Sequence, residues 1–185
     1  MSYTLRKILL GLILIFYIPI SHGQSNKSVS ALAGYTDNGI STFVSFSYSL
    51  DDIKYNFFEL GMYSGYLNEQ QTNYDIDVTI HTATLGYFKR LEFLSTHNGL
   101  ILTFAGLGGV LGNESINGGN SDLPNGALIT SKGGSIYGGF AAIHTNLYLT
   151  NRLSLLGRYT HFYHVNSEIG KSKFMIGLGL RYVLY

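Results

Sequence analysis

Strict alternation of side-chain type over residues 40–50 constrains the fold of this 185-residue chain more than any other feature. One set of alternate positions is mostly apolar, and the set between them is mostly serine. The apolar set is Ile40, Thr42, Val44, Phe46, Tyr48 and Leu50, and the other set is Ser41, Phe43, Ser45, Ser47 and Ser49. Because successive side chains of a strand point to opposite faces, this pattern predicts a β-strand with one apolar and one small, polar face.

The last segment, Phe174–Leu184, repeats the alternation, with Gly177, Gly179 and Arg181 on the face opposite its apolar residues. Six further segments are predicted to be strands, which makes eight: Ser28–Tyr35, Lys54–Tyr66, Asp75–Lys89, Leu100–Gly112, Ser135–Tyr148 and Leu153–His164. Several strands contain glycines, which suit bends and crowded interiors of small barrels. The sequence therefore predicts an all-β fold, an eight-stranded antiparallel up-and-down β-barrel.

Two kinds of eight-stranded barrel fit this periodicity. A soluble, lipocalin-like barrel that binds a ligand has apolar side chains inside, whereas a barrel of the outer-membrane type has them outside. Periodicity alone does not tell which face points outward. The polar faces consist of serine and glycine rather than lysine and glutamate, and charged residues make up only 12% of the chain, against about 25% in soluble domains. Both observations favour the outer-membrane type.

The first 23 residues have the layout of a signal peptide. Arg6 and Lys7 precede the apolar run Ile8–Ile18, and small residues follow at Ser21 and Gly23. This arrangement is typical of a cleaved export signal. We therefore expect residues 1–23 to be the signal peptide and residues 24–185 to form the outer-membrane β-barrel domain, in the outer membrane of a bacterial cell.

The expected mature chain has no strongly basic character. Removal of Arg6 and Lys7 leaves 12 − 2 = 10 Lys and Arg against 11 Asp and Glu. Nucleic-acid binding through the phosphate backbone requires clustered basic residues, so we expect no direct contact with DNA or RNA. The chain has no cysteine, which excludes thiol chemistry and cysteine-ligated metal.

The connections also follow the outer-membrane pattern if both termini are periplasmic, because periplasmic turns are short and extracellular loops long. The predicted outward loops are Thr36–Gly39, Leu67–Tyr74, Asn113–Gly134 and Val165–Lys173. The predicted inward turns are Asp51–Ile53, Arg90–Gly99 and Leu149–Arg152. Two connections fit this pattern poorly, because the outward loop Thr36–Gly39 is short and the inward turn Arg90–Gly99 is long. The longest loop, Asn113–Gly134, is the predicted interaction surface.

Motifs that could carry chemistry give no catalytic or metal site. His161 and His164 are three apart, so on a strand they point to opposite faces and cannot share an ion. Asp75 and Asp77 share a face, but two carboxylates are too few for calcium. His164, Ser167 and Glu168 are close in sequence, which does not establish the contacts of a lipid-modifying enzyme. We expect no enzyme activity, cofactor, metal or small-molecule substrate, and side chains that fill the interior.

An ordered series of segments in the second half resembles a known family. The segments are Glu114–Gly118, Asn125–Ile129, Ile136–Gly139, Tyr148–Leu156, Ser167–Phe174 and Gly177–Tyr182. Together they resemble the TraO family of conjugative-transposon proteins from Bacteroidetes, over roughly residues 106–185. The resemblance implies a non-enzymatic outer-membrane component of a conjugative, type IV-like DNA-transfer apparatus.

The resemblance also suggests where partners bind. The shared residues in or beside the long loop are Glu114, Asn117, Gly126, Tyr137 and Gly138, and they are the candidate interaction residues. Expected partners are outer-membrane lipid and other proteins of the conjugation apparatus. The alternative is a general outer-membrane barrel for adhesion or envelope stability, unconnected with transfer.

Overall fold

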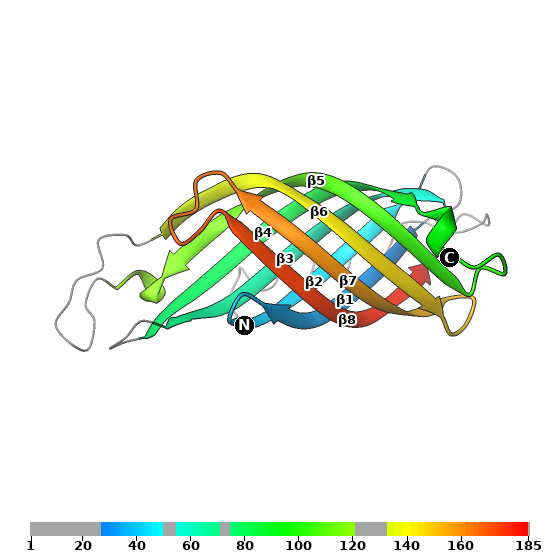
Figure 1. The fold of residues 1–185 in the computed structure, drawn as a ribbon, viewed down its shortest axis with the longest axis horizontal. Coiled ribbons are helices and arrows are strands. Elements are labelled where there is room, and N and C mark those ends of the chain that lie inside the picture. The colour runs from blue at the N-terminus through cyan, green and yellow to red at the C-terminus, as the bar shows by residue number, and fades with distance from the viewer. Residues whose placement is uncertain (1–26, 50–54, 71–74, 121–132, 185) are drawn as a thin grey trace, which may run out of the picture.

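The computed structural model describes residues 27–49, 55–70, 75–120 and 133–184, and these form a closed antiparallel barrel (Figure 1). Its strands are β1 (Lys27–Thr36), β2 (Gly39–Tyr48), β3 (Asn56–Gln70), β4 (Asp75–Arg90), β5 (Ile101–Ile116), β6 (Gly133–Tyr148), β7 (Leu153–His164) and β8 (Ser172–Leu184). The predicted signal peptide, Gly126 and Tyr185 lie outside the described residues.

Every strand pairs with its neighbours in the sequence, and β1 pairs with β8 to close the barrel. Lys27 lies opposite Leu184 in this closing pair, so both ends of the described chain lie at one end of the barrel. We call this end the terminal end. The opposite end is called the loop end, and there Thr36 of β1 pairs with Met175 of β8. The predicted eight-stranded up-and-down topology is confirmed.

Four strands extend by two or more residues beyond their predicted limits at the loop end, namely β3, β5, β6 and β8. The predicted loop Val165–Lys173 ended too late, because β8 begins at Ser172. The predicted loop Asn113–Gly134 was wrong at both ends, because β5 continues to Ile116 and β6 starts at Gly133. The predicted loop Leu67–Tyr74 also began too early, since β3 reaches Gln70. The residues in these extensions lack the apolar alternation, yet they keep their ladder partners: Glu114 pairs with Ile80 on one side and Gly134 on the other. Backbone pairing continues past the apolar part of the wall.

At the terminal end, the connection between β4 and β5 contains a short 3₁₀ helix, η1 (Glu92–Leu94). Ser95 stabilises it, because its hydroxyl donates to the Leu91 carbonyl and accepts from the Thr103 amide. A helical turn and these bonds account for the length of this predicted inward turn.

The wall of the barrel has its apolar face outside. Along β2, Ile40 and Val44 are 69% and 56% exposed, whereas Ser41 and Ser45 are buried. On β8, Leu178 is 67% exposed while Arg181 on the opposite face is buried. A ligand-binding barrel of the lipocalin type has the reverse arrangement. The fold is therefore of the outer-membrane type, as predicted. No helix among the described residues is long and apolar enough to cross a membrane.

Outward-facing tyrosines gather near both ends of the wall, and each of those that follow is at least 39% exposed. Those near the terminal end are Tyr48, Tyr87 and Tyr182, and those near the loop end are Tyr35, Tyr66, Tyr137 and Tyr163. Rings at two levels that flank an apolar band are the aromatic girdles of membrane barrels. We call them the terminal and the loop-end girdle.

Side chains fill the interior, as expected, but the serine and glycine pattern did not predict that large aromatic residues do so. A cluster of buried aromatic rings crosses it: Phe43, Phe57, Tyr63, Phe88, Phe104, Phe140 and Phe162. Glycines make room for these rings. A Cβ on Gly61 would overlap the Phe43 ring, and one on Gly106 would overlap Phe88. The glycine-rich strands thus permit aromatic packing inside a narrow barrel.

Candidate interaction surface at the loop end

Glu114 lies inside the loop end rather than on its surface. Its side chain is buried, and its carboxylate accepts hydrogen bonds from the Ser167 hydroxyl at 2.6 Å and the Glu168 amide at 3.2 Å. These donors belong to the connection between β7 and β8. The side chain of Glu114 is therefore not exposed for contact, and its part in an interaction stays a prediction that depends on the connection it holds. It holds this connection against β5 across the mouth of the barrel.

Asn166 fixes the same connection to β6. Its side-chain amide donates to the Ser135 carbonyl at 2.6 Å, and its carbonyl oxygen accepts from the Tyr137 amide at 3.0 Å. The side chain of Tyr137 itself is 51% exposed. Beside it, Gly138 packs so closely on β7 that a Cβ would overlap the Tyr163 carbonyl oxygen. Gly138 is therefore required for strand pairing, whereas Tyr137 offers a surface.

The tight turn between β1 and β2 is tied to β8 by two bonds. The Asp37 carboxylate accepts from the Phe174 amide at 3.0 Å, and the Thr36 hydroxyl donates to the Phe174 carbonyl at 2.5 Å. The Tyr63 hydroxyl donates to Thr36 at 2.9 Å from inside the barrel. The loops at this end are thus held to neighbouring strands by specific polar contacts.

Asn117 begins the connection between β5 and β6 in a left-handed backbone conformation, with a φ of 49°. Asparagine tolerates this region better than most residues. Its side-chain amide donates to the Asn120 carbonyl at 3.1 Å, so Asn117 shapes the start of this loop. Among the five candidate residues, Glu114, Asn117, Tyr137 and Gly138 lie at the loop end, and Gly126 is outside the described residues.

The histidine, serine and glutamate considered for chemistry do not form a nucleophile and base pair. The Ser167 hydroxyl donates to Glu114, and His164 faces the interior, where its ring stacks on Phe162 with centroids 5.9 Å apart. His161 is outward, with its Nε2 atom 3.2 Å from the Ser172 hydroxyl. The prediction that His161 and His164 point to opposite faces is confirmed. Asp77 is exposed on β4.

Sequence reasoning missed a buried ion pair deeper in the barrel. A guanidinium nitrogen of Arg158 lies 2.6 Å from a Glu59 carboxylate oxygen, and both side chains are buried. The other Glu59 oxygen accepts from Ser45, and the Arg158 Nε atom donates to Thr160. The guanidinium also covers the Phe43 ring at 4.1 Å. Alternation could have revealed this pair, because Glu59 and Arg158 occupy inward positions of their strands.

Removal of the Glu114 side chain is expected to free the β7–β8 connection. In Glu114→Ala the Ser167 hydroxyl and the Glu168 amide lose their acceptor, at a cost of about 1–3 kcal/mol if they stay buried and unsatisfied. Amide hydrogen exchange at Glu168 should become at least several-fold faster, whereas exchange in β2 should stay as it is. Equal exchange at Glu168 in both proteins would show that this carboxylate does not hold the connection.

A closed and filled eight-stranded barrel with an apolar outer wall and two aromatic girdles belongs to the class of small outer-membrane β-barrels. Within that class, the chain belongs to the family of the conjugative transposon protein TraO, whose family model matches residues 27–184. A search of curated protein sequences finds no significant match to this chain.

Solved structures share the fold at low sequence identity. The chain is similar to Neisserial surface protein A (TM-score 0.63, 13% identity, 88% of this chain and 100% of that one). It is also similar to the N-terminal β-barrel domain of Pseudomonas aeruginosa OprF (0.54, 14%, 88% and 100%) and to Ail, the attachment invasion locus protein of Yersinia pestis (0.52, 12%, 88% and 100%). At these identities the likeness concerns the fold alone.

Proposed function

We propose that this chain is a non-enzymatic component of a conjugative DNA-transfer apparatus, exported by its signal peptide and seated in the outer membrane. The observation that carries the proposal is the match to the conjugative transposon family over residues 27–184, a range that includes every described residue. The outer-membrane type of barrel supports the location, with the terminal end in the periplasm and the loop end outside the cell.

The filled interior supports a role that depends on surfaces rather than on passage through the barrel. Aromatic rings and the Glu59–Arg158 pair occupy the space that a conduit would need. An eight-stranded barrel is only wide enough for its own side chains. DNA therefore passes elsewhere, and this barrel acts by holding or docking other transfer proteins.

The loop end is the proposed docking surface. Its connections are fixed by the bonds of Glu114, Asn166 and Asp37, and a preorganised surface loses little entropy on binding. Tyr137 presents an exposed ring beside the β5–β6 connection. Tyrosine is enriched among residues that dominate interface energies. Tyr137 is accordingly the proposed contact residue of this surface.

Deletion of the gene from its element, followed by measurement of transfer frequency to a recipient, tests the proposal. We expect a large fall that the intact gene restores. Unchanged transfer would contradict a role in conjugation and would favour a general barrel for adhesion or envelope stability.

Complementation with two tyrosine variants locates the docking surface. Tyr137→Ala should restore transfer poorly, whereas Tyr35→Ala should restore it fully. The two residues are a matched pair, because both belong to the loop-end girdle and are 51% and 52% exposed. Equal transfer frequencies with the two variants would show that Tyr137 is only a girdle residue and not a docking contact. Both variants must reach wild-type levels in the outer membrane for the comparison to count.

A further inference from the structure

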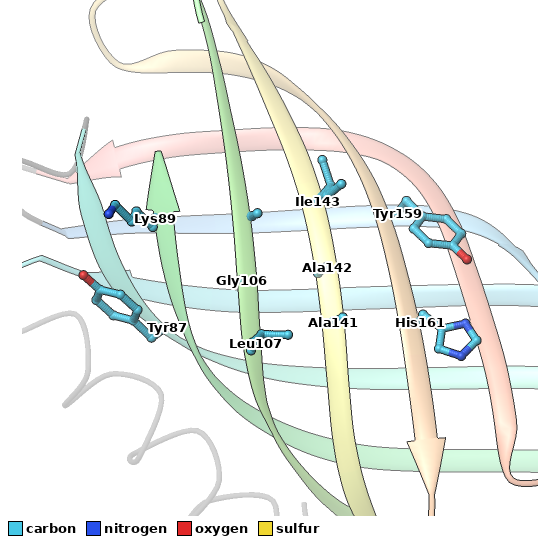
Figure 2. Close-up of a pocket in the computed structure, with 10 residues that line it drawn as sticks. Tyr87, Lys89, Gly106, Leu107, Ala141, Ala142, Ile143, Tyr159 and His161 are labelled. Atoms are coloured by element: carbon cyan, nitrogen blue, oxygen red, sulfur yellow. The ribbon is translucent and has the colours of Figure 1, made fainter. Parts of the chain in front are cut away.

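A groove runs along the outer wall of the barrel over β4, β5, β6 and β7 and has a volume of about 640 Å³. Its lining includes the small side chain of Ala105 on β5. On β6, the small side chain of Ala141 lies between taller ones (Figure 2). Tyr87 and Lys89 of β4 stand on one side, and Tyr159 and His161 of β7 stand on the other. The groove is therefore a depression in a surface that faces lipid in a membrane barrel.

The groove is apolar along its length, with a cation at one end. Lys89 lies two residues beyond Tyr87 on the same face of β4, so it sits just past the terminal girdle. Girdle rings lie at the level of lipid headgroups. The Lys89 ammonium thus lies where the groove meets the headgroup region. It takes part in no ion pair with another described residue.

Among the described residues at this end of the barrel, basic side chains outnumber acidic ones. Outside the barrel interior, the described part of the terminal end carries Lys27, Lys89, Arg90 and Arg152 against one acidic residue, Glu92. Arg90 is engaged with the Tyr55 ring at 5.9 Å. A rim with this charge balance attracts anionic lipid headgroups.

We infer that this groove binds one phospholipid, with an acyl chain between Tyr87 and Tyr159 and its phosphate on Lys89. The inference rests on the membrane location proposed above and places the lipid in the leaflet at the terminal end. Charge complementarity selects this occupant. A second barrel packed into the same groove would bury the Lys89 ammonium against an apolar wall, which is costly without a paired anion.

Filling the groove floor tests the site. The protein is placed in nanodiscs of phosphatidylethanolamine and phosphatidylglycerol, transferred to detergent and examined by native mass spectrometry for retained phospholipid. The wild-type chain should retain one phospholipid, and Ala141→Leu should lose it. Ala83→Leu is the matched control, because Ala83 is an exposed, outward alanine of β4 that does not line the groove.

The headgroup contact is tested separately. Lys89→Gln should lower retention about fivefold, the factor for about 1 kcal/mol per lysine near an anionic surface. Lys171→Gln, in the loop between β7 and β8, should leave it unchanged. Wild-type retention no higher than that of Ala141→Leu would overturn the inference, as would a dimer that Ala141→Leu abolishes.

A protein that retains no phospholipid can still be required for DNA transfer. The phospholipid site and the role in conjugation can therefore be disproved independently. Each variant is first shown to be folded by its heat-dependent mobility on a detergent gel. A folded Ala141→Leu barrel that keeps its lipid would contradict the site directly.

Discussion

Replacement of Arg158 with leucine is expected to lower the free energy of unfolding by about 3–5 kcal/mol. Arg158 is the ionic partner of Glu59, whose side chain is 2% exposed. Without this guanidinium, the carboxylate stays in the interior with a hydrogen bond from Ser45 and no ion pair, and only the more distant Arg181 supplies positive charge. An unpaired buried charge is among the few single changes with an effect of this size.

The double variant Glu59→Leu/Arg158→Leu distinguishes the contribution of the ion pair to stability from that of the packing around it. Replacement of both partners with apolar residues should recover most of the lost stability, because the desolvation cost of both charges disappears. Unfolding in urea can be followed by far-ultraviolet circular dichroism, since the chain has no tryptophan. Equal loss in the single and double variants would show that Arg158 acts through its contact with the Phe43 ring instead.

Substitution of Leu178 by arginine is expected to destabilise the bilayer-inserted barrel by about 2–4 kcal/mol. Leu178 lies in the middle of β8, 67% exposed on the outer wall. In a soluble protein such an exposed substitution usually changes stability by less than about 0.5 kcal/mol. At the centre of a membrane, the arginine side chain places a charged guanidinium in the hydrocarbon region, where leucine contacted lipid chains favourably. The two environments therefore predict different results for one substitution.

Val165→Arg is the control for this experiment. Val165 follows β7 at the loop end and is 44% exposed, and charged residues near the interface cost only about 0–1 kcal/mol. Both variants are unfolded with urea from lipid vesicles and compared with the wild-type barrel. A neutral Leu178→Arg would contradict the assignment of the outer wall to lipid.

Side-chain alternation was enough to predict the strands and the barrel. The serine positions Ser41, Ser45 and Ser47 face inward, and the apolar positions of β2 and β8 face outward. The choice between membrane and soluble barrels followed from the identity of the polar face. Serine and glycine suit a narrow interior, whereas a solvent-facing wall needs charge.

The interior could not be predicted from the same pattern. Phe43 lies among serines on the polar face of β2, and the alternation does not explain why an aromatic residue occurs there. Its ring packs in the space that Gly61 leaves because glycine has no side chain. Such a fit depends on the register between β2 and β3, in which Phe43 pairs with Tyr63. Register across a barrel is set by the closure of all strands, which a local pattern does not contain.

The positions of the loops at the loop end were predicted approximately, but the contacts between them were not. Glu114 shares the inward face of β5 with Val110 and Ile116, so counting by two from either would have placed it inside. It was assigned to a loop because its polar neighbours ended the apolar alternation. The partners of Glu114 are 53 and 54 residues away in sequence, and only the closed barrel brings them together.

Electrophoresis of the refolded protein in detergent micelles, with and without heating, tests the central claim that this chain is a membrane barrel. We expect the unheated sample to migrate differently from the heated one, and Arg158→Leu to lose this difference at a lower temperature. Identical migration of both samples, together with a protein that stays soluble and monomeric without detergent, would contradict the membrane barrel and both proposals built on it.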